Sequence, residues 1–424
     1  FVELVDLHGA IANLRKIAGE DLQAAKAAML QAAQAPSPVP LPGMDKLLQQ
    51  EIELFMEVLD QTDAARIVLK YDGNDLAMNT SIKVMEGKGL AKFAAGTKDR
   101  KIELHKKLPA GGWLTIAQNI DPKVFEAWTQ LGLDFYAGFL QLNDEEKAKL
   151  KGLMTQMMDL ETGEMAMSIG RDGDFPARIL TITGMKDGEK GRTLFFDAMT
   201  MIFSKLGAAV EQYAGPDATR GMPKLDWSSF KNFMEGMKPI LGQVGVTAEF
   251  TASKAGNAAV DALVLSVDYA KIPGAANSPE VQNVSKVMGN KLGFAIGADK
   301  GALYFTMGKD AVADVGKLSS EAGAGGGALG DAMAKSGTNA AIAGWLSIID
   351  LLKIAAVFSP EINAAIPNLA TMPADAGISF VVGGHGERII DASIALPITK
   401  IAALVPKPGA APAAAPAAPV APAP

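Results

Sequence analysis

The sequence predicts an α+β fold with two related domains, each a curved antiparallel sheet packed by helices, followed by a disordered Pro/Ala-rich C-terminal tail. Three observations predict it: β-hairpin patterns recur along the chain, a strand-to-helix motif is repeated, and the last segment has a linker's composition. The motif is Gly-Trp-Leu-Thr-Ile at 112–116 before Asp121, repeated as Gly-Trp-Leu-Ser-Ile at 344–348 before Asp350. Aspartate is a favoured helix N-cap, because its side-chain oxygen accepts a bond from a free backbone N–H of the first turn.

The first predicted domain covers residues 1–214. It opens with a strand at 1–7, which is a third possible copy of the motif because Asp6 follows a β-prone run. Helices are predicted at 10–34 and 44–60, separated by a proline-rich break. The clearest hairpin joins strands at 64–71 and 76–85 around Asp-Gly-Asn-Asp. Leu76, Met78 and Ile82 alternate with polar residues in its second strand, which is typical of a sheet with one wet face.

Helices and a second hairpin complete this domain. A basic connection at 98–107 is predicted as strand-like, and a helix from 124 to 139 carries an apolar stripe. Asn143 and Glu146 have the spacing of a capping box for the next helix. Strands at 164–169 and 177–185 form the hairpin, and a helix follows from about 189 to 213.

The second predicted domain covers residues 241–405, after a loop-rich linker at 215–240. Hairpins are predicted at 246–252 with 258–269, 292–298 with 302–307, and 378–382 with 389–396. Because the parts recur in order about 180 to 230 residues apart, the sequence predicts a divergent repeat with an insertion near 272–335. Residues 406–424 contain only Pro, Ala, Val, Lys and Gly and are predicted to be an extended, mobile tail.

Composition excludes several classes of protein. Among 424 residues, 49% are hydrophobic and 21% charged, yet there is no run of 18 apolar residues, so no transmembrane span is predicted. The net charge of −7 and the lack of a dense basic cluster argue against a nucleic-acid partner. There is no cysteine, which excludes disulfides, thiolate metal sites and cysteine nucleophiles.

The motifs of catalysis are absent or out of context. The three histidines are His8, His105 and His385, and none has a second ligand at metal-binding spacing. The Gly-x-Gly-x-x-Gly at 325–330 follows a helical segment, whereas a dinucleotide site needs a preceding strand, so a flexible loop is predicted there. Carboxylate pairs occur in hairpin turns without the rest of a calcium-binding loop. The sequence therefore predicts no catalytic residue, no metal site, no cofactor and no enzyme, with a spatially assembled hydrolase as the most distant alternative.

Apolar side chains are the feature with functional meaning. The chain has 20 Met and 17 Phe, concentrated on the predicted helices at 124–158 and 189–206. Flexible Met side chains adapt to irregular apolar partners. The stripes fit a domain core, a groove for a lipid or another hydrophobic ligand, or faces that other protein chains cover. The residues predicted to line such a groove are Trp113, Trp128, Phe135, Phe139, Met154, Met157, Phe196 and Phe203.

The order of parts, the 112–116 motif and the alternating strand Gly-Glu-Met-Ala-Met at 163–167 resemble bacterial exported envelope proteins of unknown function. The resemblance implies tandem sheet-rich α+β domains and an extracytoplasmic setting, in the periplasm or cell envelope. Because the chain begins at Phe1, a signal segment is expected to have been removed or to be missing. The predicted function is non-enzymatic binding of a hydrophobic ligand or lipid. The alternative is a structural subunit of a larger assembly, with its apolar faces buried against partner chains.

Overall fold

The computed structural model describes residues 2–4, 61–71, 73–87, 89–98, 100–172, 175–218, 225–272, 289–320, 327–336, 340–358, 368–386 and 388–402, with single positions at 278, 285, 362, 365 and 366. The helices predicted at 10–34 and 44–60 and the tail predicted at 406–424 lie outside these residues.

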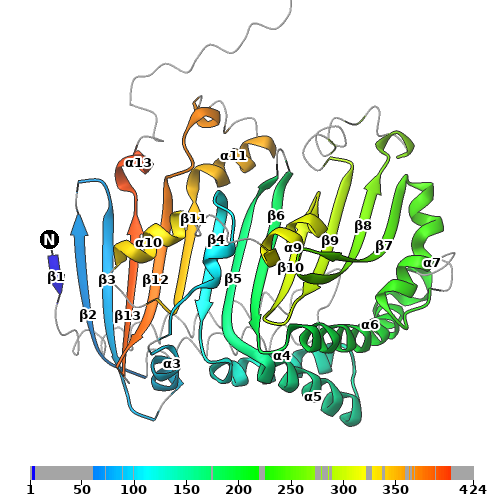
Figure 1. The fold of residues 1–424 in the computed structure, drawn as a ribbon, viewed down its shortest axis with the longest axis horizontal. Helices are drawn as coiled ribbons and strands as arrows, with labels where there is room; N and C mark the ends of the chain where they lie inside the picture. The colour runs from blue at the N-terminus through cyan, green and yellow to red at the C-terminus, as the bar shows by residue number, and fades with distance from the viewer. Residues whose placement is uncertain are drawn as a thin grey trace, which may run out of the picture.

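The described strands form one antiparallel sheet of thirteen strands, seen face-on in Figure 1. Its spatial order is β1-β2-β3-β13-β12-β11-β4-β5-β6-β10-β9-β8-β7. The strands are β1 (Val2–Leu4), β2 (Thr62–Tyr71), β3 (Leu76–Val84), β4 (Gly112–Asn119), β5 (Glu161–Asp172), β6 (Phe175–Met185), β7 (Val246–Ala255), β8 (Ala258–Val267), β9 (Lys291–Ala298), β10 (Ala302–Gly308), β11 (Ile342–Ser347), β12 (Gly377–His385) and β13 (Ile389–Leu396).

All five predicted hairpins are confirmed as adjacent antiparallel pairs: β2–β3, β5–β6, β7–β8, β9–β10 and β12–β13. Three further pairings, β3–β13, β4–β11 and β6–β10, join strands of the first half of the chain to strands of the second. The mixed helix-and-strand class with a large antiparallel sheet is therefore confirmed. The two halves contribute to one continuous sheet, and the division into two domains stays a prediction.

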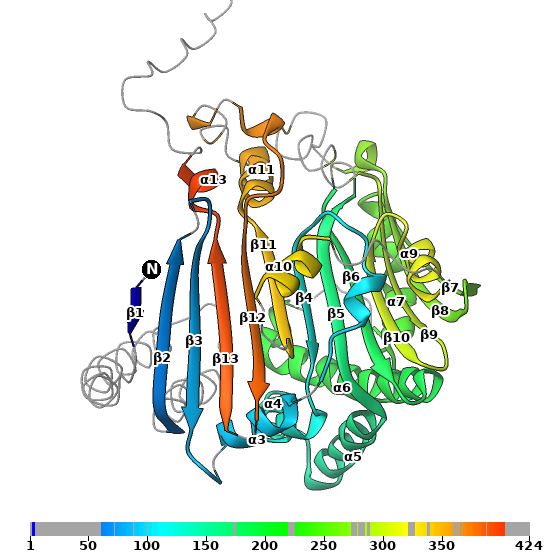
Figure 2. The same cartoon turned by 60° about the vertical axis from the view of Figure 1, so that its left-hand side comes forward.

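Helices lie on both faces and both ends of the sheet. Figures 1 and 2 show α9 and α10 in front of the strands, with α4, α5 and α6 at one end and α11 and α13 at the other. The helices are α3 (Gly89–Thr97), α4 (Glu126–Phe139), α5 (Asp144–Leu160), α6 (Gly188–Ala218), α7 (Phe230–Gln243), α9 (Ala311–Ser320), α10 (Ala328–Ser336), α11 (Ile348–Phe358) and α13 (Ile398–Ala402); the 3₁₀ turns are η1 (Leu104–Lys107), η2 (Pro122–Phe125), η3 (Tyr269–Lys271) and η5 (Leu369–Thr371).

Local capping follows the sequence in two places and departs from it in a third. The capping box is confirmed, because Asn143 N donates to Glu146 and Glu146 N donates to Asn143 Oδ1 over 2.9 Å. Asp121 caps η2 by accepting a bond from Lys123 N at 3.0 Å. The predicted cap at Asp350 is wrong. Because β11 continues directly into α11, Asp350 lies in the first turn and donates its N–H to Ser347 Oγ at 3.1 Å.

Three segments that the sequence assigned otherwise contain helix. The predicted linker at 215–240 holds the end of α6 and most of α7, whose N-cap Ser229 accepts a bond from Asn232 N. The strand-like segment at 98–107 contains η1 instead. Within the Gly-rich stretch predicted as a flexible loop, α10 begins at Ala328 and its Leu329 is fully buried. Tertiary burial of an apolar side chain overrides weak local propensity in this last case.

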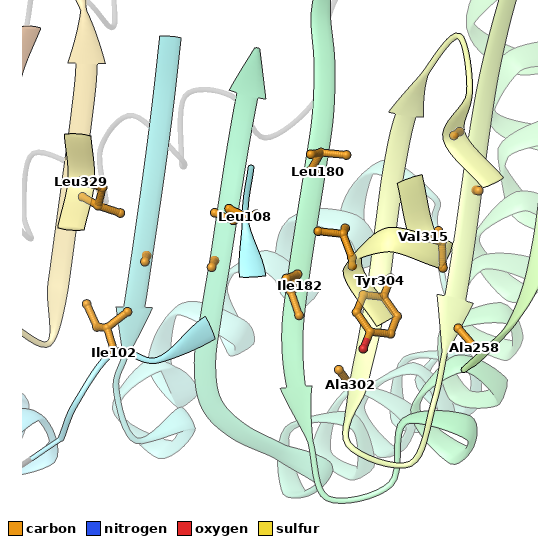
Figure 3. Packing of buried hydrophobic residues seen from close by; sticks show 14 of the residues in the cluster. Ile102, Leu108, Leu180, Ile182, Ala258, Ala302, Tyr304, Val315 and Leu329 are labelled. Carbon is orange, nitrogen blue, oxygen red and sulfur yellow. The ribbon is translucent and has the colours of Figure 1, made fainter. Parts of the chain in front are cut away.

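One face of the sheet, here called the buried face, carries the main hydrophobic core from β8 to β12. Figure 3 shows its side chains between the strands and the covering helices. Tyr304 is fully buried there, and its hydroxyl donates to Asp299 Oδ2 at 2.7 Å. A single row of directly paired residues crosses this face through Val260, Gly297, Tyr304, Ile182, Ala166, Ala117, Ala343 and Val381.

Candidate functional site

The eight residues predicted to bind a hydrophobic ligand lie on four elements. One of the eight, Met154, lines a cleft, which lies between η2, α4 and α5. The side chains of Trp128 and Phe135 are outside the described residues. The set is distributed as follows: Trp113 on β4; Trp128, Phe135 and Phe139 on α4; Met154 and Met157 on α5; Phe196 and Phe203 on α6.

Phe203 belongs to an aromatic cluster at the corner formed by α6, α7 and β7. Its ring centroid lies 5.3 Å from those of Trp227, Phe230 and Phe233. Phe230 in turn contacts Phe250 of β7 edge-to-face, with centroids 6.1 Å apart. Edge-to-face pairs of this kind add to the energy of simple burial. Phe196 packs on Phe195, with ring centroids 5.8 Å apart. Trp227 and Phe230 were missed by the sequence analysis because they fall in the predicted linker.

The second face of the sheet, here called the half-buried face, is apolar over almost its whole width. Most of its side chains are only half-buried, and Phe305 is 37% exposed. The ring of Phe380 lies over the backbone of β11 because Gly344 has no side chain: a Cβ there would stand 2.1 Å from Phe380 Cε1. The glycine of the second motif copy therefore leaves room for the Phe380 ring on this face.

Two rows of directly paired residues define the half-buried face. The first row is Phe250, Leu263, Phe294, Met307, Ile179, Ile169, Leu114, Leu346 and Ile378. The second row is Ile296, Phe305, Thr181, Met167, Ile116, Gly344, Phe380, Ile394, Met78 and Leu69. Thr181 is the sole polar member of these nineteen positions.

Helices contact the half-buried face near its two ends. Arg192 of α6 forms an ion pair with Asp261 of β8, and Phe230 of α7 contacts Phe250 of β7. At the opposite end α3 packs on β12, where a Cβ on Gly384 would stand 2.3 Å from the backbone oxygen of Ala94. The central strands β5, β4 and β11 lie between these contacts in the sheet order.

A cleft of about 390 Å³ lies between η2, α4 and α5. Met154 contributes to its wall, together with Leu133 and Met158. Charged groups of both signs surround these apolar residues: Asp121, Lys123, Glu126, Lys151, Asp159, Glu161 and Lys186. The mixture provides a partly apolar floor with a charged rim and no grouping typical of a catalytic site.

Burial raises the pKa of Glu161, the carboxyl group at the base of this cleft, above its usual value near 4.5. Because the pKa of Glu161 is higher in the folded state than in the unfolded state, its protonated form makes its full contribution to folding stability below pH 4.5. That contribution is lost as the pH rises through the folded-state pKa.

Glu161→Gln is therefore expected to raise the melting temperature at pH 7 and to leave it unchanged at pH 4, because the amide mimics the protonated acid. Thermal melts at the two pH values measure the effect. Glu249→Gln is the matched control, since Glu249 is exposed on β7 and its replacement should change neither melt. An equal shift at both pH values for Glu161→Gln would contradict this origin.

His105 is the one buried side chain in the described structure with an unsatisfied polar atom, its Nδ1. The residue is 4% exposed within η1, and burial lowers the pKa of its imidazole. It lines none of the clefts described here, so it adds no reactive group to them. His385 is exposed at the end of β12.

Metal ligation and membrane spanning have no structural support in the described part of the chain. No group of three His, Asp or Glu side chains there could hold a metal ion. Among the described helices, none combines the length and the apolar character needed to cross a bilayer.

Comparison with protein-family models, with curated proteins and with solved structures found no match for this chain.

Proposed function

We propose that the half-buried face binds an elongated hydrophobic ligand, such as a lipid acyl chain, and that the protein is not an enzyme. The observation that supports the proposal is the pair of apolar rows, most of whose side chains remain half-buried, whereas the opposite face carries the main core with its fully buried residues. Each methylene group removed from water contributes about 0.8 kcal/mol, so a ligand that covers these rows gains affinity along its length.

The shape and chemistry of the rows suit an acyl chain. From Met307 on β10 to Leu346 on β11 the first row crosses five strands, which at about 4.8 Å per step is roughly 19 Å. An extended acyl chain has a similar length and no polar group that would need a hydrogen-bond partner. Met167 and Met307 supply flexible side chains that adapt to such a ligand.

Native mass spectrometry of the protein purified from its source tests the proposal. The expected spectrum is a monomer with added mass that denaturation releases as lipid. A larger complex without small-molecule mass would contradict lipid binding and support the structural-subunit alternative.

We also propose an extracytoplasmic location on the basis of the sequence resemblance. Purification therefore starts from separate periplasmic and cytoplasmic fractions, and recovery from the cytoplasm would contradict that location.

Single-residue variants test whether the bound lipid lies on the half-buried face. Phe305→Gln is expected to fold, because the side chain is already 37% exposed, and to lower lipid occupancy severalfold by placing an amide in the second row. Val244→Gln is the matched control, since Val244 is 40% exposed in the turn after α7 and lies outside both rows. Equal occupancy in the two variants would place the ligand elsewhere.

We further propose that residues 1–214 and 241–405 are related copies that share one sheet. Its strand order supports this, because hairpin β2–β3 lies beside β13 of the other half just as hairpin β9–β10 lies beside β6. The middle one of the three pairings between the halves joins β4 to β11, the strands that carry the repeated Gly-Trp motif. Each half therefore contributes a hairpin that pairs with a strand of the other half.

A further inference from the structure

A second cleft, of about 650 Å³, lies on the other side of the sheet from the half-buried face. Strands β3, β13, β12 and β11 form its floor, and α10 and the start of α13 form its walls. Figure 2 shows α10 in front of β12 and β11. One row of directly paired residues crosses the floor from Lys70 on β2 through Ala77, Ala395 and Ser379 to Trp345 on β11.

Small side chains produce this hollow. On β6 and β10 the same face of the sheet carries Ile182 and Tyr304, which are fully buried in the core. On β3 and β13 the corresponding floor positions are Ala77 and Ala395, and α10 presents Ala328 and Ala332 to the cleft. Since neither the strands nor the helix supply large apolar groups here, the space between them stays open.

The floor holds polar groups that lack a partner within the described chain. The side chains of Asn79, Ser379 and Ser393 and the indole N–H of Trp345 make no hydrogen bond there. Ser393 is 7% exposed and lines the cleft. A ligand that enters the cleft displaces water from these polar groups and must supply donors and acceptors in its place.

The rim carries balanced charge. Lys70, Lys335 and Lys400 face Asp75, Asp331 and Asp375 around the cleft, and Lys400 Nζ lies 2.5 Å from Asp375 Oδ2. The six charges sum to zero, so the rim has no field that would favour an anion or a cation over a neutral ligand. It still provides ammonium donors and carboxylate acceptors.

The indole of Trp345 is held in a fixed position. A Cβ on Gly377 would stand 2.4 Å from its Cζ2, which shows that the ring packs directly on the backbone of β12. A rigid aromatic surface beside unpaired amide and hydroxyl groups matches a ligand with one apolar ring face and a hydroxylated edge.

We propose that this cleft binds a short neutral oligosaccharide. The apolar face of one sugar ring stacks on Trp345, its hydroxyl groups bond Ser379, Ser393 and Asn79, and the chain extends over the small floor toward Lys70. Four strand-to-strand steps of about 4.8 Å separate β2 from β11, roughly 19 Å, which accommodates a few sugar rings in a row. The site is independent of the ligand proposed for the half-buried face.

The test is a printed array of neutral oligosaccharides of two to four sugar residues, probed with the labelled full chain. We expect at least one to bind, and its affinity is then measured by isothermal titration calorimetry. Ala332→Leu replaces a methyl group of α10 in the cleft with an isobutyl group without changing the sheet, and it should weaken binding by about tenfold or more, the loss of roughly one good contact. Ala334→Leu on the exposed side of the same helix should leave the affinity unchanged.

A second variant keeps the result interpretable if the first unfolds. Ser393→Ala removes a hydroxyl from the floor and adds no atom to the cleft, so it should also weaken binding of that oligosaccharide. Circular dichroism and thermal melting establish that each variant is folded. No binding on the array above background would overturn the proposal, and so would unchanged affinity in the folded Ala332→Leu or Ser393→Ala protein.

Discussion

Dividing the chain between α6 and α7 is expected to leave neither fragment folded alone, whereas the two fragments expressed together should assemble. The reason is the strand order. Fragment 1–220 keeps β1-β2-β3 and β4-β5-β6 but loses β13, β11 and β10, the three neighbours that join and complete these groups. Fragment 221–424 loses β3, β4 and β6 in the same way. Each fragment would expose unpaired strand edges, which favour aggregation over folding.

Solubility, circular dichroism and co-purification of a tagged fragment measure this outcome. The control removes residues 1–4, which takes away the edge strand β1 and leaves all the other strand pairings in place. That truncation is expected to leave the remainder of the sheet intact. Two fragments that fold separately at the α6–α7 division would show independent domains and contradict a shared sheet.

Arg178→Met is expected to lower the free energy of unfolding by about 3–5 kcal/mol, the usual result of removing one partner of a buried ion pair. Arg178 of β6 donates to Asp314 of α9 through two hydrogen bonds, of 2.9 and 2.5 Å. The Asp314 side chain is 4% exposed and that of Arg178 is 22% exposed. Removing the arginine therefore leaves a carboxylate in the core with little access to water. Urea denaturation measures the change.

The exposed fractions of the two side chains also predict that replacing Asp314 destabilises the protein less than replacing Arg178. Asp314→Asn should cost less, about 1–3 kcal/mol, because the arginine left behind still reaches water and the amide still accepts a bond. The double variant Arg178→Met with Asp314→Leu should recover most of the loss, since no unpaired charge remains. Lys238→Met, which removes an exposed ion pair with Glu235, is the control. If Arg178→Met lowered the free energy of unfolding no more than Lys238→Met does, the buried pair would contribute no more than an exposed pair.

Hairpins were predictable because their information is local. In β2–β3 the turn residues and the period-two alternation lie within about two dozen residues of sequence, and the register follows from the turn. The capping box of α5 was predictable for the same reason, since Asn143 and Glu146 are three residues apart. Helix α10 was not, because only the core beneath Leu329 stabilises it in a Gly-rich stretch.

The candidate sites were predictable only in chemical character. The number of Met and Phe residues led to the prediction of hydrophobic binding, but the two rows of the half-buried face lie on strands, with members such as Ile116, Met167 and Phe380. The predicted residues were drawn mainly from helix stripes. The second cleft had no sequence signal, because Lys70, Ser393 and Trp345 meet there from strands that are far apart in the chain.

By itself the sequence determined the class of the fold, its five hairpins, most of its helices and the apolar character of the protein. Alternation, turn residues and caps act over a few residues, so one chain segment contains all the information they need. The tertiary structure alone decided which hairpins are neighbours, which face of the sheet is closed and where clefts remain. Those outcomes depend on contacts such as the hydrogen bond from Ser81 to Asp391, across 310 residues, and no local pattern encodes them.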